Sequence, residues 1–238
     1  AMEEGNWDIY EGQYFDEWNR DIHVIAPCAI PNHWRRIISF DYGFENPASV
    51  GWYAISPGGE EWIRYRELYR TKLTYQALGR EILEMTPIGE TIDFATADPS
   101  VWGDRPHHDE EPGPTGGQIL EEMFEERDIP LIRANHDRIQ GWQRCRELLK
   151  PVALPDGRIG SRFKVFSTCV NFIRTVPAMV HDNIRVEDLD TKAEDHCADE
   201  FRYAVSTTLS EHKRLDYERS YESALATLPS NGGIGWSR

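Results

Sequence analysis

The sequence has no apolar run long enough to cross a membrane. Nowhere in its 238 residues do apolar residues approach the stretch of about 18 that a membrane-spanning helix needs. The first residues, "AMEEGNWDIY", are acidic and lack the basic and apolar regions of a secretory signal peptide. We therefore expect a soluble, intracellular protein without a membrane partner, and the Ala before Met2 indicates a piece of a longer protein.

Paired cysteines and basic charge are also scarce. No CxxC motif links the four cysteines, so neither a zinc knuckle nor a disulfide framework is predicted, and we expect reduced thiols. The net charge is -15, from 41 acidic and 26 basic residues, which argues against a simple nucleic-acid coat because Lys and Arg must neutralise phosphates there. An enzyme that cuts DNA is not excluded, since it needs carboxylates to hold cations and a partner domain can supply the grip.

A phosphate-binding loop for ATP is missing as well. Nothing matches GxxxxGK[ST], and no Gly-Lys pair occurs, so we expect a chain that neither binds nor hydrolyses ATP. The length suits one domain with appendages. We interpret residues 1–33 as a connecting arm, 34–205 as the domain and 206–238 as a C-terminal tail.

Hydrophobic periodicity and turn signals predict an α/β domain. Three strands come first and form an antiparallel group, then helices and strands alternate, and helices follow, an order typical of a mixed sheet with helices on both faces. The turn signal around Asp156 predicts a hairpin over 151–166. The predicted strands are 35–41, 48–56, 61–70, 91–98 and 129–134, the last of them buried; the predicted helices are 74–85, 118–128, 138–150, 167–176 and 190–209.

Three aspartates stand where predicted elements end or meet the core. Asp41 ends the first strand, Asp98 ends the fourth before Pro99, and Asp199 lies on the last helix. Each has an ordinary structural explanation by itself: Asp41 as a turn residue, Asp98 as the start of a loop, and Asp199 as one charge on a solvated helix face.

Taken together, the three carboxylates indicate a cation site. Asp199 borders the apolar stripe that contains Ala198, and a carboxylate beside the core needs a cation or hydrogen-bond donors. His196 and Asp195 lie three and four residues before Asp199, which places all three on one side of a helix. Three oxygen ligands are the set that Mg²⁺ or Mn²⁺ prefers.

Four segments carry a resemblance to a known family. In this order and spacing, "ISFDYGFENPASVGWYAI", "FATADPSVWG", "NHDRIQGWQRCRELL" and "EDHCADEFRYAV" resemble the C-terminal nuclease domain of the large terminase subunit of tailed bacteriophages, and "GNWDIYEGQYFDEWNRDIHVI" is similar to the segment that precedes it. The resemblance implies a ribonuclease-H-like fold whose first three strands are antiparallel. It also implies endonucleolytic cleavage of double-stranded concatemeric phage DNA during genome packaging, with two Mg²⁺ or Mn²⁺ ions.

The resemblance assigns roles residue by residue. Asp41 matches the metal-binding aspartate that bridges both ions, while Asp98 and Asp199 match the second and third. His196 matches a histidine of the closing motif and, with Asp195, is an accessory residue. The implied partners are double-stranded DNA, the ATPase domain of the full-length protein, the portal protein and the small terminase subunit. The implied location is the cytoplasm of the infected bacterial host.

Basic residues beside the turn at Asp156 are candidates for DNA contacts. We expect the hairpin and the loop 99–117 to flank the carboxylates, with Arg158, Arg162 and Lys164 on phosphates; ordinary solvated charges are the alternative.

Other functions are compatible with the same residues. The first is another ribonuclease-H-like enzyme, of the resolvase or transposase type. The second is a non-catalytic module that docks on the portal or another partner, with the carboxylates holding a structural ion. A zinc hydrolase built from His107, His108 and Asp109 is disfavoured because adjacent histidines in a loop lack the helical spacing of such sites.

Overall fold

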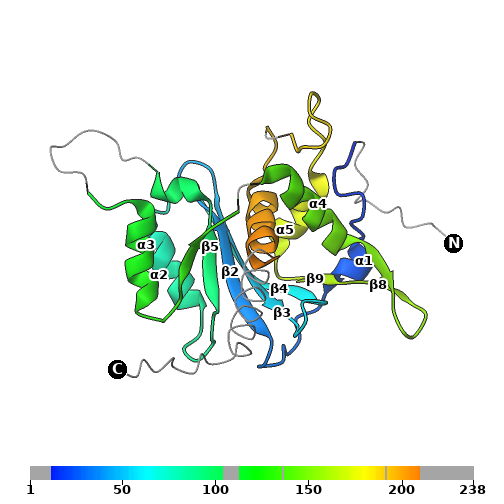
Figure 1. Cartoon of the computed structure of the whole chain (residues 1–238), viewed down its shortest axis with the longest axis horizontal. Helices are drawn as coiled ribbons and strands as arrows, with labels where there is room; N and C mark the ends of the chain where they lie inside the picture. The colour runs from blue at the N-terminus through cyan, green and yellow to red at the C-terminus, as the bar shows by residue number, and fades with distance from the viewer. Residues whose placement is uncertain (1–11, 104–112, 136, 191, 210–238) are drawn as a thin grey trace, which may run out of the picture. The chain divides into compact units, whose positions relative to one another are not determined.

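A seven-stranded mixed sheet runs through the centre of the fold (Figure 1). The computed structural model describes residues 12–103, 113–135, 137–190 and 192–209. The described residues up to Thr207 form one compact unit, to which all the contacts below belong. The strand order is β1-β9-β4-β3-β2-β5-β6, and β7 and β8 form a separate two-stranded hairpin. The strands are β1 Val24–Ile25, β2 Arg35–Asp41, β3 Ala48–Ile55, β4 Trp62–Arg70, β5 Phe94–Ala97, β6 Leu131–Arg133, β7 Pro151–Ala153, β8 Ile159–Ser161 and β9 Phe163–Phe166.

The helices lie between and after these strands. Helix α2 begins after Thr74, whose side chain accepts a hydrogen bond from the Ala77 amide, as its sequence predicts. The helices are α1 Arg20–His23, α2 Tyr75–Met85, α3 Gly116–Glu125, α4 Arg138–Leu149 and α5 Val170–Thr175, with 3₁₀ turns η1 Pro99–Trp102 and η2 Val176–Ala178. Residues 196–209 are also helical and are called the C-terminal helix below. None of the helices in the described part of the chain combines the length and apolar character that crossing a membrane requires.

Strand directions confirm the predicted mixed sheet. β2, β3 and β4 pair antiparallel, whereas β5 pairs parallel with β2, and β6 pairs parallel with β5. Because β2 and β5 are parallel neighbours, their carboxyl ends reach the same edge of the sheet. Asp41 and Asp98 therefore meet at one edge.

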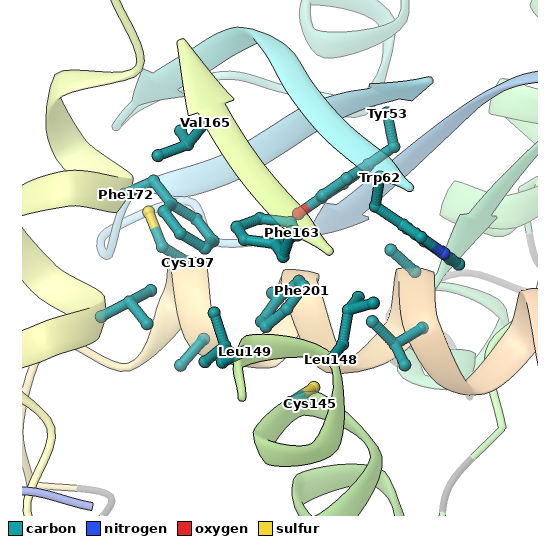
Figure 2. Close-up of a cluster of buried hydrophobic side chains, with 14 of the residues drawn as sticks. Tyr53, Trp62, Cys145, Leu148, Leu149, Phe163, Val165, Phe172, Cys197 and Phe201 are labelled. Carbon is teal, nitrogen blue, oxygen red and sulfur yellow. The ribbon is translucent and has the colours of Figure 1, made fainter. Parts of the chain in front are cut away.

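Each face of the sheet is covered by its own group of helices (Figure 1). On one face, α2 and α3 pack Leu78 and Leu120 against β2 residues such as Phe40. On the other, α4, α5 and the C-terminal helix enclose an aromatic cluster around Phe163 and Phe201 (Figure 2). The rings of Phe163 and Phe201 lie 4.7 Å apart, so the C-terminal helix is held directly on the sheet.

The structure departs from the predicted elements in four main places. The predicted hairpin over 151–166 contains only β7 and β8, and β9 joins the central sheet between β1 and β4. The arm contains α1 and β1, and β1 adds a parallel strand beside β9, whereas the sequence predicted no regular element there. The fifth predicted strand, β6, is a half-buried edge strand instead of a buried one. The last helix begins at residue 196 instead of 190, because the Asp190 side chain accepts a hydrogen bond from the Lys192 amide and forms a local turn that competes with helix.

Candidate active site

The first two aspartates are brought together by the register of the sheet. Asp41 is the last residue of β2, and Phe40 beside it pairs with Ala97, the last residue of β5. Asp98 follows directly and caps η1, where its Oδ1 accepts a hydrogen bond from the Ser100 amide at 2.7 Å. Both carboxylates thus stand where their strands stop, with the backbone turning away from the sheet.

The C-terminal helix carries the third aspartate across this region. Hydrogen bonds from two strands hold the helix: Ser39 Oγ donates to the Glu200 carbonyl at 2.7 Å, and the hydroxyls of Thr96 and Thr207 lie 3.2 Å apart. These contacts, with the packing of Phe201, place Asp199 near Asp41, close enough for its charge to raise the pKa of Asp41. The C-terminal helix therefore forms one side of the site.

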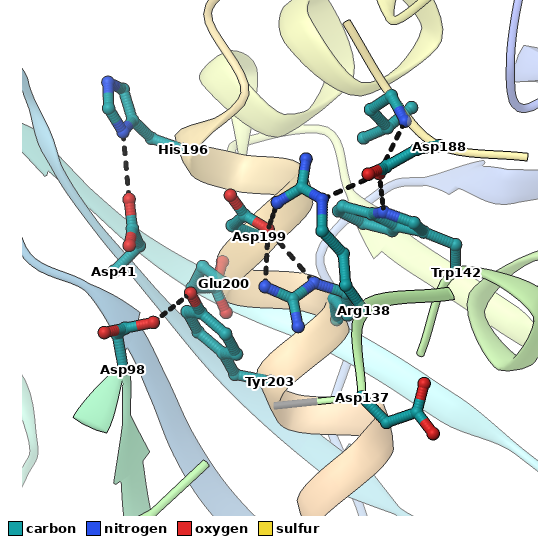
Figure 3. Close-up of polar contacts among 12 residues, drawn as sticks. Asp41, Asp98, Asp137, Arg138, Trp142, Asp188, His196, Asp199, Glu200 and Tyr203 are labelled. Atoms are coloured by element: carbon teal, nitrogen blue, oxygen red, sulfur yellow. Dashed lines mark hydrogen bonds and ion pairs between the residues drawn. The ribbon is translucent and has the colours of Figure 1, made fainter. Parts of the chain in front are cut away.

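Asp41 and His196 form a half-buried pair. The Nδ1 of His196 lies 2.9 Å from Oδ2 of Asp41, and each side chain is 17% exposed (Figure 3). Burial raises the pKa of Asp41, the hydrogen bond from His196 opposes this, and the charges of Asp199 and Asp98 raise it further. In turn, the hydrogen bond to Asp41 raises the pKa of His196. The predicted accessory histidine is thus a direct partner of the central aspartate.

Asp98 has a partner that the sequence reasoning missed. The Tyr203 hydroxyl donates to Oδ2 of Asp98 at 2.5 Å. Burial raises the pKa of Tyr203 above its usual range, so the phenol stays a donor at neutral pH. Tyr203 lies four residues after Asp199 on the same helix, and this spacing was the available signal for it.

Asp199 is bound by two arginines, which were also missed. Its Oδ1 accepts from Arg202 Nε at 3.0 Å and Nη2 at 2.7 Å, and Arg138 Nη1 lies 3.3 Å away. Arg202 is three residues along the same helix, a spacing that predicts contact. Arg138 begins α4, which is capped by the Asp137 side chain, and no local pattern links it to Asp199.

The donor set fits a hard divalent cation, although its side chains are not arranged around one. Asp195 joins the group: burial and the charge of Asp199 raise its pKa to about 6. Asp41 and Asp195, whose pKa values are raised by neighbouring carboxylates, gain from a nearby cation, and oxygen ligands suit Mg²⁺ or Mn²⁺. Among the described residues, however, no group of three or more His, Cys, Asp or Glu side chains is positioned to hold a metal. Asp41, Asp98 and Asp199 instead bind His196, Tyr203 and the two arginines respectively.

The hairpin does not flank the carboxylates as predicted. Across the sheet, Lys164 on β9 pairs with Ile63 on β4, which pairs with Ala54 on β3. Ala54 pairs in turn with Arg36, near the start of β2. Asp41 lies at the other end of β2, so the hairpin joins the sheet at the end away from the carboxylates. The predicted phosphate contacts are paired with acidic neighbours: Arg158 with Asp156, Arg162 with Glu147 and Lys164 with Glu61.

The loop predicted to flank the site is described only in part. Its first residues form η1 and its last residues enter α3. His107, His108 and Asp109, the residues of the disfavoured zinc site, lie outside the described residues.

Comparison with known proteins identifies the fold. No family model matches the sequence, and no curated protein matches it. The large terminase of a thermophilic bacteriophage, solved in complex with ADP, aligns with a TM-score of 0.63 and 18% identity over 83% of this chain and 46% of that chain. The nuclease domain of the P22 large terminase aligns with a TM-score of 0.58 and 17% identity over 83% of this chain and 92% of that domain.

These alignments confirm the predicted fold class. The chain has the ribonuclease-H-like fold of large terminase nuclease domains, with the antiparallel β2-β3-β4 group in a mixed sheet. It spans about half the length of the thermophilic phage protein, 46%. At identities of 17% and 18% the likeness is one of fold.

Proposed function

We propose that this chain is the nuclease domain of a phage large terminase. In this proposal it cuts double-stranded concatemeric DNA during genome packaging by metal-dependent hydrolysis of phosphodiester bonds. The observation that carries the proposal is the meeting of Asp41, Asp98 and Asp199 at one edge of a sheet with this fold. The resolvase or transposase and docking alternatives lack a specific observation in their favour.

The three aspartates would hold two Mg²⁺ or Mn²⁺ ions. Asp41 matches the aspartate that bridges both ions in the resembled family, and the charges of Asp98 and Asp199 both raise its pKa. Asp98 and Asp199 would complete the ligand set. When bound, the ions would supply a Lewis acid for the attacking water and charge stabilisation for the leaving 3′ oxygen. His196 orients the Asp41 carboxylate through its Nδ1 hydrogen bond, and Tyr203 does the same for Asp98.

The negative charge of the chain implies that DNA is bound mainly by other components of the packaging complex. With a net charge of -15, the isolated chain would repel the DNA backbone overall. We assign the grip to the ATPase domain of the full-length protein, the portal and the small terminase subunit, in the cytoplasm of the infected host. The proposed DNA contacts of Arg158, Arg162 and Lys164 would require their acidic partners to be displaced.

Plasmid cleavage tests the proposal. Purified protein is incubated with supercoiled plasmid and Mn²⁺, beside an EDTA control, Asp41→Ala and Asp93→Ala, whose exposed carboxylate pairs with Arg35 at the opposite end of β2 from Asp41. We expect nicking that disappears with EDTA and with Asp41→Ala but persists with Asp93→Ala. Asp98→Asn and Asp199→Ala should abolish cutting too, whereas Asp195→Ala should be milder. Cutting by Asp41→Ala at the wild-type rate would remove this residue from the site.

Metal binding gives a second readout that does not depend on turnover. A ligand that binds only the native state raises the melting temperature, so Mn²⁺ should stabilise the wild-type protein and not Asp41→Ala. An intact plasmid together with no Mn²⁺ stabilisation would contradict a metal-dependent nuclease. Binding to portal protein would then be measured, because it separates the docking alternative from a silent domain.

A further inference from the structure

Arg138 bridges two aspartates at the edge of the candidate site. Its Nε lies 2.7 Å from Oδ1 of Asp188, and its Nη1 lies 3.3 Å from Oδ1 of Asp199 (Figure 3). Asp188 is fixed in turn, since the indole Nε1 of Trp142 and the Leu189 amide both donate to the same oxygen, at 2.9 and 2.8 Å. The Arg138 guanidinium is therefore held closely by Asp188 and more loosely by Asp199.

The two arginines on Asp199 differ in how tightly they are held. Arg202 makes two contacts to Asp199 from the same helix, and its side chain is 4% exposed. Arg138 makes one longer contact from another element, and its side chain is 28% exposed. Both guanidiniums lie over the ring of Trp142. Arg202 is thus a permanent neighbour of Asp199, whereas the contact of Arg138 is the one that can open.

The contacts to Asp199 share one oxygen. All three fall on Oδ1, and in the view of Figure 3 the other oxygen points away from the arginines, to the side on which Asp41 lies. The Nη2 of Arg138 and the Nη1 of Arg202 are buried without a hydrogen-bond partner in the described structure. Two guanidiniums therefore crowd a single carboxylate oxygen and are not fully satisfied by it.

We propose that Arg138 is the displaceable counter-ion of Asp199, beside the permanent contact of Arg202, and that it competes with divalent cations for this carboxylate. The ion pair with Asp188 keeps the Arg138 side chain in place when the contact between Arg138 and Asp199 opens. The inference rests on the proposed function, because it takes Asp199 as a metal ligand. It explains why the carboxylates, which share one region, are not arranged around a common centre: a guanidinium already neutralises Asp199.

The opposite role for Arg138 makes the opposite prediction. If Arg138 served only to orient Asp199 for the metal, its removal would weaken metal binding, since hydrogen bonds to a ligating carboxylate support affinity. If it competes, its removal strengthens binding. The sign of the change in Mn²⁺ affinity therefore separates the two roles.

Calorimetric titration with Mn²⁺, supported by the spin-resonance signal of free Mn²⁺, provides the test. The variants are Arg138→Met and, as a matched control, Arg144→Met, which removes the same charge from α4 at a residue bonded to Gln140 and not to Asp199. For Arg138→Met we expect Mn²⁺ to bind about fivefold more tightly, the effect of losing one partly exposed ion pair. For Arg144→Met we expect wild-type affinity. Arg138→Gln, which keeps a donor for Asp188, is the second variant if Met disturbs packing on Trp142.

The outcomes distinguish failure of this inference from failure of the proposed function. Equal or weaker Mn²⁺ binding by both Arg138 variants, with measurable wild-type binding lost in Asp41→Ala, would overturn the competition and leave the metal site intact. An absence of Mn²⁺ binding in wild type and in both Arg138 variants would overturn both. Binding by the Arg138 variants but not by wild type would support the competition in its strongest form.

Discussion

Removing Arg64 should destabilise the fold by an amount that depends on pH. Arg64 lies on β4 with a fully buried side chain, and its Nη1 contacts the carboxylate of Glu200, which is also fully buried on the C-terminal helix. Nη1 also contacts the Tyr53 hydroxyl at 2.7 Å, and the guanidinium lies 4.7 Å from the ring centre of Phe172. Arg64→Met keeps an apolar stem of similar length and leaves the Glu200 carboxylate without its cation.

The size of the loss follows from the burial of this pair. Removing one partner of a buried ion pair costs about 3–5 kcal/mol, because the other charge is left uncompensated. Burial already raises the pKa of Glu200 to about 7, and Arg64 is the main opposing cause. Because this folded-state pKa is above the ordinary value, the contribution of Glu200 to stability is full below about pH 4.5 and is lost as pH rises through 7. Without Arg64 the pKa of Glu200 rises further, so the variant loses more stability than wild type as pH increases. The destabilisation caused by Arg64→Met should therefore be greatest at pH 8 and smaller toward pH 5.

Urea unfolding followed by tryptophan fluorescence at pH 5, 6, 7 and 8 measures this penalty. The control is Arg70→Met on the same strand, where the ion pair with Glu81 is exposed, with 62% of the Arg70 side chain accessible, and should contribute less than about 1 kcal/mol at every pH. A loss below about 1 kcal/mol for Arg64→Met at pH 8 would refute the prediction, because an uncompensated buried carboxylate should cost several times more. A loss that does not change between pH 5 and 8 would refute the role of Glu200 protonation.

Two further predictions concern neighbouring parts of the fold. Gly51→Ala should cost about 3 kcal/mol in urea unfolding, since a methyl group there collides with the buried ion pair, while Gly113→Ala, which meets nothing within 4 Å, should be nearly neutral. Glu194→Gln should lose about 0.5–1 kcal/mol at pH 7 because this half-exposed carboxylate pairs with Arg174. The hydrogen bond from Arg174 lowers the pKa of Glu194 to about 2, so this contribution is present above about pH 4.5 and is lost as pH falls through 2. A variant whose stability declines as steeply as wild type in acid would contradict that assignment.

Local sequence patterns predicted the main elements and the ends of the strands at which Asp41 and Asp98 stand. Alternating and helical periods are local properties, so β2, β3, β4 and α2 begin and end within a residue of their predicted bounds. An aspartate that ends a strand is visible in the sequence, whereas the parallel pairing of β2 and β5, which brings Asp41 and Asp98 to one edge, is seen only in the structure. The apolar stripe of the C-terminal helix, with Ala198, Phe201 and Val205 buried, was predictable for the same reason.

The side chains that meet across the sheet could not be predicted from local patterns, because their contacts depend on how whole elements pack. Arg138 is 61 residues from Asp199, and Arg64 is 136 residues from Glu200, so no periodic pattern connects either pair. The addition of β1 to the sheet edge and the distance of the hairpin from the carboxylates likewise depend on register and helix length. A buried cation finds its carboxylate through packing of whole elements, which is why the local sequence predicts the aspartates of this site and not the arginines that neutralise them.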